Sequence, residues 1–479
     1  MNYLFANIIL VASFLIYSLT TKQMRLHLVH LCLFLIVLLY WISVFIAADV
    51  ENAILEAIKI TTILPFAILF SALSKEQMMK IFRWIPYMGA FLVVIGVIFQ
   101  LERQQRLEST IGYANALAIF LLVSLLMSIF FYMKKASKID FILMIIQATG
   151  LLLTFSRSVW VLWIVSVAAL ALFQEFRKRN MWLRIMSIHV FSFIIAALLK
   201  WDMFFFWSRL KTIQPETSEF QMRLMYWKDS LPMITDYFWL GTGGGGWSVW
   251  QSFYQSEGYF VRFVHNHYLQ LALDIGVFGS LLFILIAIIL YYRSFALYKS
   301  LKTVAENSSL VWIKGVVLAS TVLLLHAGFD FDFSFLFILA LFLMFVEYIM
   351  VQSPDMATRL INPSKSVKAI LSICLVVMLF FTSWMEVGKY FQMRGQSNVT
   401  IGNMQSAIQD YSIAQKLMPW AASTYYDMAK VYVLLGNKSG NRNDYLEGKK
   451  QVEQAVHRLP HEKLYQQLNE DLYENLMKE

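Results

Sequence analysis

Long uninterrupted apolar segments dominate this chain, and they constrain its fold more than any other feature. Runs close to the ~20 residues that a helix needs to cross a bilayer recur from the start of the chain to about residue 385. Of the 479 residues, 59% are hydrophobic and only 15% are charged, whereas soluble domains carry roughly 25% charged residues. We therefore predict an all-α fold, a polytopic transmembrane helical bundle.

We predict about twelve membrane spans, followed by a soluble tail. This divides the chain into a transmembrane bundle at residues 1–385 and a small helical domain at residues 386–479. The predicted spans are residues 3–20, 28–47, 53–73, 85–100, 112–132, 139–154, 158–174, 183–200, 267–292, 310–327, 333–351 and 368–385.

The short connections between these spans alternate in charge, and this alternation predicts their orientation. One set of connections holds most of the basic residues, around positions 22–25, 75–83, 134–138, 177–184, 293–302 and 359–368. Because basic residues in short loops stay cytoplasmic, we expect a multi-pass protein of the cytoplasmic membrane. Its N-terminus, its longest loop and its C-terminal domain are expected on the outer side. This topology accounts for the net charge of +9, so nucleic acid is not an implied partner.

The longest loop, residues 201–266, is far longer than an ordinary connection, and loops of that size are usually functional. A capping-box pattern at residues 218–221 predicts the start of a helix, and the glycine run GTGGGGW at residues 241–247 ends that stretch. We expect a short helix that lies as a lid on the bundle. The residues predicted to share its packed face are Phe220, Arg223, Trp227 and Leu231.

The tail at residues 386–479 has a helical pattern with a loose internal repeat, in which alanine, tyrosine and a closing proline recur. This pattern resembles tetratricopeptide helix pairs, and an ordinary helical domain is the alternative. Because repeat surfaces commonly bind extended ligands, the tail is a candidate site for an extracytoplasmic protein or glycan partner.

The sequence indicates neither a disulfide framework nor a cofactor site. Cys32 and Cys374 each lie inside an apolar run, which argues against paired cysteines and against a metal site. There is no His-Glu-x-x-His pattern, and the glycine run lacks the Lys-Ser/Thr that ends a phosphate loop. We therefore expect no cofactor and no metal.

A histidine marks the point where the long loop enters the span at 267–292. His265 lies in the stretch VHNHYLQL, residues 264–271, at the expected water boundary. Imidazole titrates near neutrality and can take a proton from a sugar hydroxyl. The alternative is that His265 caps the helix or hydrogen-bonds within the loop.

Two arginines are candidates for binding an anionic substrate. Arg157 lies between two apolar runs, and Arg223 lies on the expected loop helix. A guanidinium binds phosphate oxygens in bidentate fashion, although contact with lipid headgroups or with a carboxylate explains either position as well. Arg103 and Arg106 rank lower because the mixed run at residues 102–108 can pair internally.

Further polar and aromatic residues are candidates for contact with a glycan. These are His326, Asp330 and Asp332, in a hairpin between two spans, and Trp247, for which lid packing is an equal explanation. Glu56 and Lys59 lie one turn apart, and we expect them to form a helical ion pair.

Three stretches together form a recognisable pattern: Arg223-x3-Trp227, residues 236–243, and His265-Asn266-x-Tyr268-Leu269-Gln270 with Gly276 and Gly279. This pattern resembles the core signature of the O-antigen ligase and polymerase group, and Ser156-Arg157 resembles that family's other marked arginine. The resemblance spans about residues 110–350. It implies a polyprenyl-diphosphate-linked glycan as donor, Arg157 and Arg223 as diphosphate ligands, and His265 as the group that activates the acceptor hydroxyl. His267 departs from the pattern, so its role stays open.

Residues and resemblance together predict a metal-independent, inverting glycosyltransferase at the outer membrane face. The favoured function is polymerisation of lipid-linked repeat units for a cell-surface polysaccharide. The alternatives are a ligase that transfers the glycan to a wall polymer, lipid core or protein, and a transporter or flippase of the same lipid.

Overall fold

The computed structural model describes residues 3–177, 179–200, 211, 218–303, 307–353 and 359–478. Within these ranges the fold is all-α, as predicted, and strands occur only in two short antiparallel pairs. One pair joins β1 (Met24–Leu26) to β4 (Arg359–Ile361), and the other joins β2 (Glu102–Arg103) to β3 (Arg106–Leu107).

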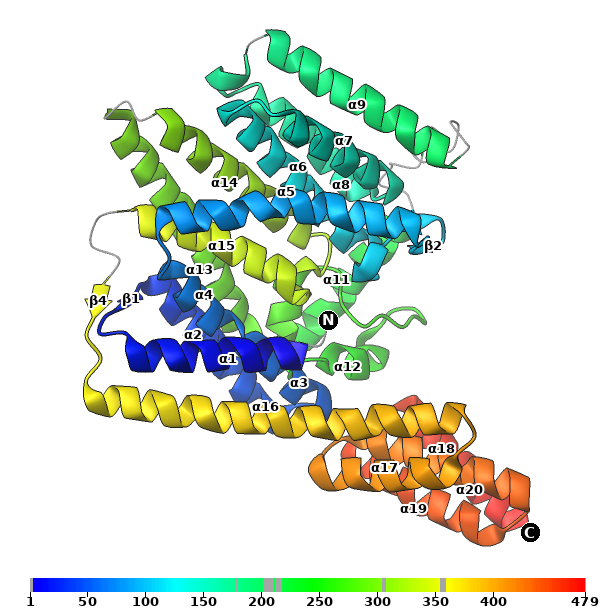
Figure 1. The fold of residues 1–479 in the computed structure, drawn as a ribbon. Coiled ribbons are helices and arrows are strands. Elements are labelled where there is room, and N and C mark those ends of the chain that lie inside the picture. The colour runs from blue at the N-terminus through cyan, green and yellow to red at the C-terminus, as the bar shows by residue number, and fades with distance from the viewer. Residues whose placement is uncertain are drawn as a thin grey trace.

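Figure 1 shows the helices as a bundle from which the last four extend to one side. The bundle helices are α1 (Tyr3–Thr20), α2 (Leu28–Ser43), α3 (Val50–Thr61), α4 (Ile63–Ser71), α5 (Lys75–Ile98), α6 (Ala114–Lys134), α7 (Lys138–Leu153), α8 (Arg157–Leu170), α9 (Arg179–Lys200), α11 (Ser218–Asp236), α12 (Gly246–Tyr254), α13 (His267–Thr303), α14 (Asn307–Ala327), α15 (Leu336–Gln352) and α16 (Lys365–Thr400). Short 3-10 turns lie at η1 (Val44–Ile46), η2 (Ser109–Ile111), η3 (Gln174–Phe176) and η4 (Asp332–Ser334). The tail helices are α17 (Met404–Leu417), α18 (Ala422–Ser439), α19 (Arg442–Arg458) and α20 (Lys463–Lys478).

The apolar helices make the chain a multi-pass membrane protein. In the part of the chain that the structure describes, nine helical segments are long and apolar enough to cross a membrane, with α3 and α4 counted together. The other three predicted spans also coincide with helices, but these are shorter: α7 has 16 residues, α8 has 14 and α15 has 17. The prediction of about twelve spans is therefore confirmed in length and composition for nine of them.

The bundle is built around α6. The most apolar window of α6 is 83% buried, whereas that of α16 is only 17% buried. A helix that is apolar on all sides and enclosed by protein is a core helix, and one that leaves most of its apolar surface open is expected to face lipid. The centre of the bundle is therefore α6, and its surroundings hold the residues described below.

The glycine run packs against an interruption in α13. Ile275 and Gly276 depart from helical geometry inside α13, and the carbonyl oxygens freed there accept from the loop. Thr242 N donates to Leu273 O at 2.8 Å, and Gly243 N donates to Asp274 O at 3.0 Å. The break is thus closed by backbone hydrogen bonds, and it fixes the loop between α11 and α12 on the bundle.

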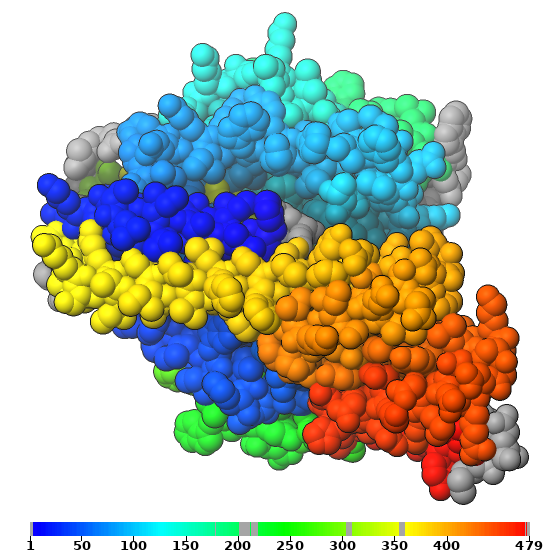
Figure 2. All heavy atoms as spheres, turned by 60° about the horizontal axis from the view of Figure 1, so that its bottom comes forward, coloured from blue at the N-terminus to red at the C-terminus, as the bar shows by residue number. Residues whose placement is uncertain are grey.

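The tail is continuous with the membrane region. Helix α16 runs without interruption through residue 385, the predicted domain boundary, and Figure 2 shows it lying along α1 before it meets the tail helices. Glu51 at the start of α3 accepts from Lys389 on α16 at 2.5 Å and from Ser423 on α18 at 2.8 Å. These contacts hold the tail against the bundle. The likeness of the tail to tetratricopeptide repeats stays a prediction.

Candidate active site

One buried carboxylate organises a polar cluster where several helices end. Asp330 lies in the turn between α14 and η4 and is fully buried. Its oxygens accept from Tyr113 Oη at 2.8 Å, Asn115 Nδ2 at 2.7 Å and the following backbone N–H at 2.9 Å. Two groups that carry or can carry positive charge complete the set: His265 Nδ1 at 3.1 Å and Arg223 Nη2 at 3.4 Å. Asp330 thus joins segments far apart in the sequence.

Asp330 stays ionised in this environment. Burial acts to raise its pKa, but the hydrogen bond from His265 and the charge of Arg223 outweigh burial and hold the pKa well below its usual value. Tyr113 shows the opposite effect, since burial and the charge of Asp330 raise its pKa well above the ordinary value. The phenol therefore remains a donor to an anionic carboxylate.

His265 is oriented by its backbone and by Asp330. Its φ of 52° lies in the left-handed region, which is unfavourable for a residue with a side chain, and Trp227 Nε1 donates to its carbonyl oxygen at 3.2 Å. When the imidazole is neutral and Nδ1 donates to Asp330, Nε2 carries the lone pair. The side chain is 22% exposed, so the ring is partly open. An imidazole held in this way is able to act as an oriented general base.

Three guanidinium groups lie near the same carboxylate. Arg223 contacts Asp330 directly, and Arg157 at the start of α8 pairs with Glu219, which lies one turn before Arg223 on α11. Arg106 donates to Asn115 Oδ1 at 2.6 Å, and burial lowers its pKa, although the charges of Glu108 and Asp330 act in the opposite direction. With Glu219 displaced, the three arginines would outnumber the buried Asp330 and Asp332, and such a cluster can bind an added anion such as a phosphate.

The structure brings together His265 and Arg223 as the sequence pattern predicts, and it adds residues that sequence reasoning missed. Arg106 does not pair within its own run, although Arg103 does so with Glu108 at 2.9 Å. Tyr113 and Asn115, at the start of α6, were not recognised. The available signal was an amide at the first turn of an otherwise apolar helix, where an unpaired polar group would be costly.

A second histidine–carboxylate pair lies next to the first. His326 Nδ1 and Asp332 Oδ2 are 2.5 Å apart, and His326 Nε2 lies 2.9 Å from Ser158 Oγ. His326 and Asp332 are fully buried, so neither side chain reaches the protein surface. In this structure the pair joins the end of α14 to the start of α8, directly beside Arg157.

Trp247 follows the packing alternative given for it, whereas the face of the lid helix lies differently from the predicted arrangement. Trp247 is fully buried in a cluster with Tyr226 and Met233, so it packs beneath α12 and presents no open face for a sugar ring. Helix α11 begins at Ser218, as predicted, but Leu231 is 53% exposed. The buried face instead includes Tyr226 and Met233, and Asp229 on that face accepts from Tyr259 Oη at 2.8 Å.

A small cavity is lined by residues that flank His265 in the sequence. Phe263 and His267 line it, together with Arg262 and the Glu56–Lys59 pair. The predicted ion pair between Glu56 and Lys59 is confirmed. The other residues that line the cavity are Tyr40, Asn52, Ile60, Gly245, Ser248, Gln270, Asp274, Phe333 and Ser334. The cavity is chemically suited to hydroxyl groups, since its lining includes both hydrogen-bond donors and hydrogen-bond acceptors.

Comparison with known proteins identifies part of this region. Residues 142–284 match the family described as O-antigen ligase, which confirms over that range the resemblance seen in the motifs. The matched range contains Arg157, Arg223 and His265, whereas Asp330 lies beyond its end. No individual curated protein matches the chain.

Proposed function

We propose that this membrane protein transfers a glycan from a polyprenyl diphosphate carrier to an acceptor hydroxyl. The proposal starts from the match of residues 142–284 to the O-antigen ligase family. The observation that supports this most directly is the contact between His265 Nδ1 and Asp330, which orients the imidazole beside a group of arginines. Base and anion site thus lie side by side, as such a transfer requires.

In the proposed reaction the donor diphosphate lies against Arg157 and Arg223, with Arg106 behind them. Binding requires the Glu219 carboxylate to leave Arg157. The Glu219 side chain is 62% exposed, so water can solvate the carboxylate once it has left. The guanidinium groups bind the ground state and also stabilise the negative charge that develops on the departing diphosphate. We propose that no metal is needed for this step, because the arginines supply the positive charge.

His265 acts as the general base. As the acceptor oxygen forms a bond to the anomeric carbon, the bond from that carbon to the diphosphate oxygen breaks. The acceptor proton passes to Nε2 of His265, and the electron pair of the broken bond leaves with the diphosphate. Asp330 holds Nδ1 protonated and stabilises the imidazolium that forms. A single displacement of this kind inverts the anomeric configuration.

We propose a positioning role for the residues first considered as glycan ligands. Asp330 orients His265, and His326 with Asp332 fixes the start of α8 through Ser158. The small cavity lined by Arg262 and the Glu56–Lys59 pair is the better candidate for holding sugar hydroxyls. Because this set of polar residues lies at the ends of helices opposite to the basic connections, we place the reaction at the outer face of the cytoplasmic membrane.

The transporter alternative gains no support from the break in α13. Broken helices in transporters expose backbone groups to the substrate, whereas here Thr242 and Gly243 already donate to the carbonyls freed at the break. We propose polymerisation ahead of ligation, because the docked tail offers a surface for a growing chain.

The decisive experiment is reconstitution of the purified protein in liposomes with the lipid-linked repeat unit as sole substrate. A ladder of longer lipid-linked glycans is expected, and His265→Ala should abolish it while leaving the protein folded. Arg157→Lys should impair transfer, because an ammonium cannot reproduce the bidentate contact. If single units persist until a separate acceptor is added, the protein is a ligase. Wild-type activity in His265→Ala would remove the base mechanism.

A further inference from the structure

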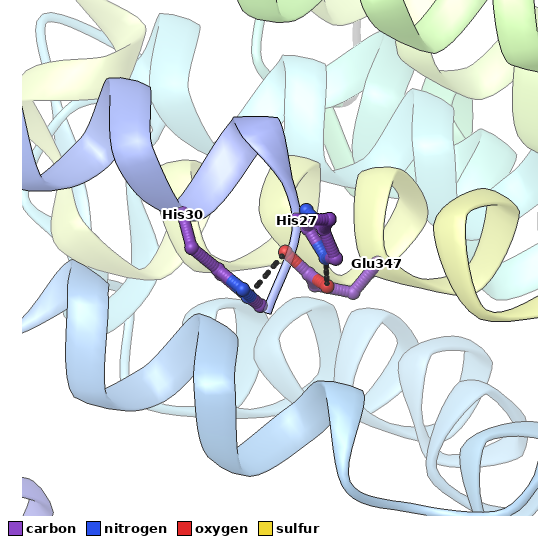
Figure 3. Close-up of side chains that lie close together, drawn as sticks. All are labelled: His27, His30 and Glu347. Carbon is purple, nitrogen blue, oxygen red and sulfur yellow. Dashed lines mark hydrogen bonds and ion pairs between the residues drawn. The ribbon is translucent and has the colours of Figure 1, made fainter. Parts of the chain in front are cut away.

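Three buried side chains with metal-binding chemistry converge away from the arginine cluster. His27 is the N-cap residue of α2 and directly follows β1, His30 lies in the first turn of α2, and Glu347 lies on α15. Figure 3 shows the three side chains pointing toward one another, the two imidazoles from one side and the carboxylate from the other. Their ligand atoms all lie within 4.8 Å of one another.

These groups are removed from solvent without being fully satisfied. The side chains of His27 and Glu347 are 0% exposed, and that of His30 is 4% exposed. His27 Nε2 lies 2.7 Å from Glu347 Oε2. Among the residues that the structure describes, however, Nδ1 of His27 and Nδ1 of His30 have no hydrogen-bond partner, and His30 Nε2 lies 3.3 Å from Glu347 Oε1. An unpaired buried polar atom costs about 1–3 kcal/mol, so two in one place require a reason.

Two protonation patterns are open to these groups without a metal. With Nε2 protonated on each neutral imidazole, both histidines donate to Glu347, and their buried Nδ1 atoms stay without a partner. Protonating both histidines would place two like charges in rings stacked with centroids 3.8 Å apart, at a site with little water to screen them. A divalent cation, by contrast, is attracted to the carboxylate and to both imidazole lone pairs.

We propose that His27, His30 and Glu347 form a binding site for a divalent transition metal of the zinc class. Two imidazole nitrogens and a carboxylate are ligands that Zn²⁺ accepts at about 2.0–2.2 Å. Tetrahedral bonds of that length place neighbouring ligand atoms about 3.3 Å apart, which is the separation of His30 Nε2 and Glu347 Oε1. The His27–Glu347 contact would lengthen slightly, and the second carboxylate oxygen or a water would fill the fourth position.

The ion has a structural role at this place in the fold. It joins the segment between β1 and α2 to α15, and β1 is also paired with β4, which leads into α16. Glu347 lies eleven residues into α15, about 16 Å along the helix from its start near η4 at ~1.5 Å per residue. The proposal is therefore independent of the proposed glycosyl transfer. Sequence reasoning gave no metal site because His27 and Glu347 are 320 positions apart.

The first test uses the wild-type full-length protein in detergent. Metal analysis after purification in zinc-containing medium should find about one zinc per chain, and chelation should lower the melting temperature, which added Zn²⁺ restores. Replacement by Co²⁺ should give the visible ligand-field bands of a four-coordinate nitrogen and oxygen site. A chain with no stoichiometric metal and no Co²⁺ spectrum overturns the proposal, whatever the variants do.

The second test compares variants. Glu347→Gln keeps the shape of the side chain and removes its charge, and it should weaken Zn²⁺ binding by at least 100-fold, more than the 10–100-fold typical of losing a supporting group. His189→Gln is the matched control, since His189 lies on α9 and contacts the carbonyl of Ile185 in its own helix. Equal Zn²⁺ affinity in the Glu347→Gln and control variants would assign the metal to another site and overturn the proposal.

Discussion

At the residue scale, the proposed site depends on how one carboxylate divides its contacts. Asp330 uses Oδ1 for His265 and the backbone, and Oδ2 for Tyr113, Asn115 and Arg223. The same group therefore sets the tautomer of the base and neutralises part of the arginine cluster. Replacing it changes proton transfer first, because the imidazole loses the acceptor that fixes Nδ1–H.

Asp330→Asn should lower the rate of transfer by about 10²–10⁴-fold, as expected when the acceptor that orients a catalytic histidine is lost. The amide keeps the shape of the side chain but presents a donor or a weaker acceptor to His265. The measurement is the initial rate in liposomes. Asp410→Asn is the control, since Asp410 pairs with Arg394 in the tail. Similar losses in both variants would indicate a general effect on folding.

Ser158→Ala tests whether the second histidine–carboxylate pair takes part in chemistry. Its contacts resemble those of an activated serine nucleophile, but we propose that Ser158 only positions α8. Most of the activity should remain, and the product should keep the inverted configuration. A loss of about 10³-fold or more, or a product of retained configuration, would instead point to a glycosyl-serine intermediate.

At the scale of elements, the loop between α11 and α12 matters because it closes the break in α13. Gly241 has a φ of 67°, and a Cβ placed there would lie 2.5 Å from the backbone of Asp274. Glycine is required at this position for two reasons, conformation and space. The break and the lid helix are therefore one structural unit, although Gly241 and Ile275 lie 34 positions apart in the sequence.

Gly241→Ala should lower the melting temperature and the rate of transfer together, with a loss of roughly 1–3 kcal/mol from strain in addition to the steric clash. Gly440 offers a matched control, because its φ is 66° but nothing lies within 4 Å of its added Cβ. Gly440→Ala therefore reports the conformational cost alone. The prediction is wrong if thermal unfolding shows the same loss in both variants.

The sequence predicted the elements better than it predicted their contacts. Apolar length was sufficient to locate α1, α6 and α14, because lipid leaves a backbone few alternatives. The register of α11 was wrong at Leu231, since an aromatic and polar face buries Tyr226 and Asp229 instead. His265, Arg157 and Arg223 came from local motifs. Tyr113 and Asn115 were not found, because only the folded chain brings them to Asp330.

At the scale of the whole molecule, the basic connections and the polar site define two ends of the bundle. From the positive-inside rule we propose that the tail and the arginine cluster lie on the same, outer side. Contacts of Glu51 with Lys389 and Ser423 agree with a tail that starts at the end of the bundle where α3 begins. One accessibility measurement tests the orientation of all these parts.

A variant without Cys32 and Cys374 and with Ser439→Cys should react with an impermeant thiol reagent on intact cells. Ser439 is exposed at the end of α18, so the new thiol is accessible wherever the tail lies. A cysteine at Lys135, in the basic connection between α6 and α7, is the control and should react only after permeabilisation. The opposite pattern would invert the topology and the side on which the reaction is placed.

The packing of α1 against α16 has a consequence for biosynthesis. Asn7 on α1 is fully buried, and it donates to Ile58 O at 2.9 Å and accepts from Thr382 on α16 at 3.0 Å. Since Thr382 lies 375 positions after Asn7, a ribosome adding about 5–20 residues per second reaches it roughly 20–75 s later. During that interval α1 must wait in the bilayer without its final neighbour. The hydrogen bond to Ile58 on α3 gives the Asn7 amide a partner that is synthesised early. The amide of α1 is therefore partly satisfied before α16 is made.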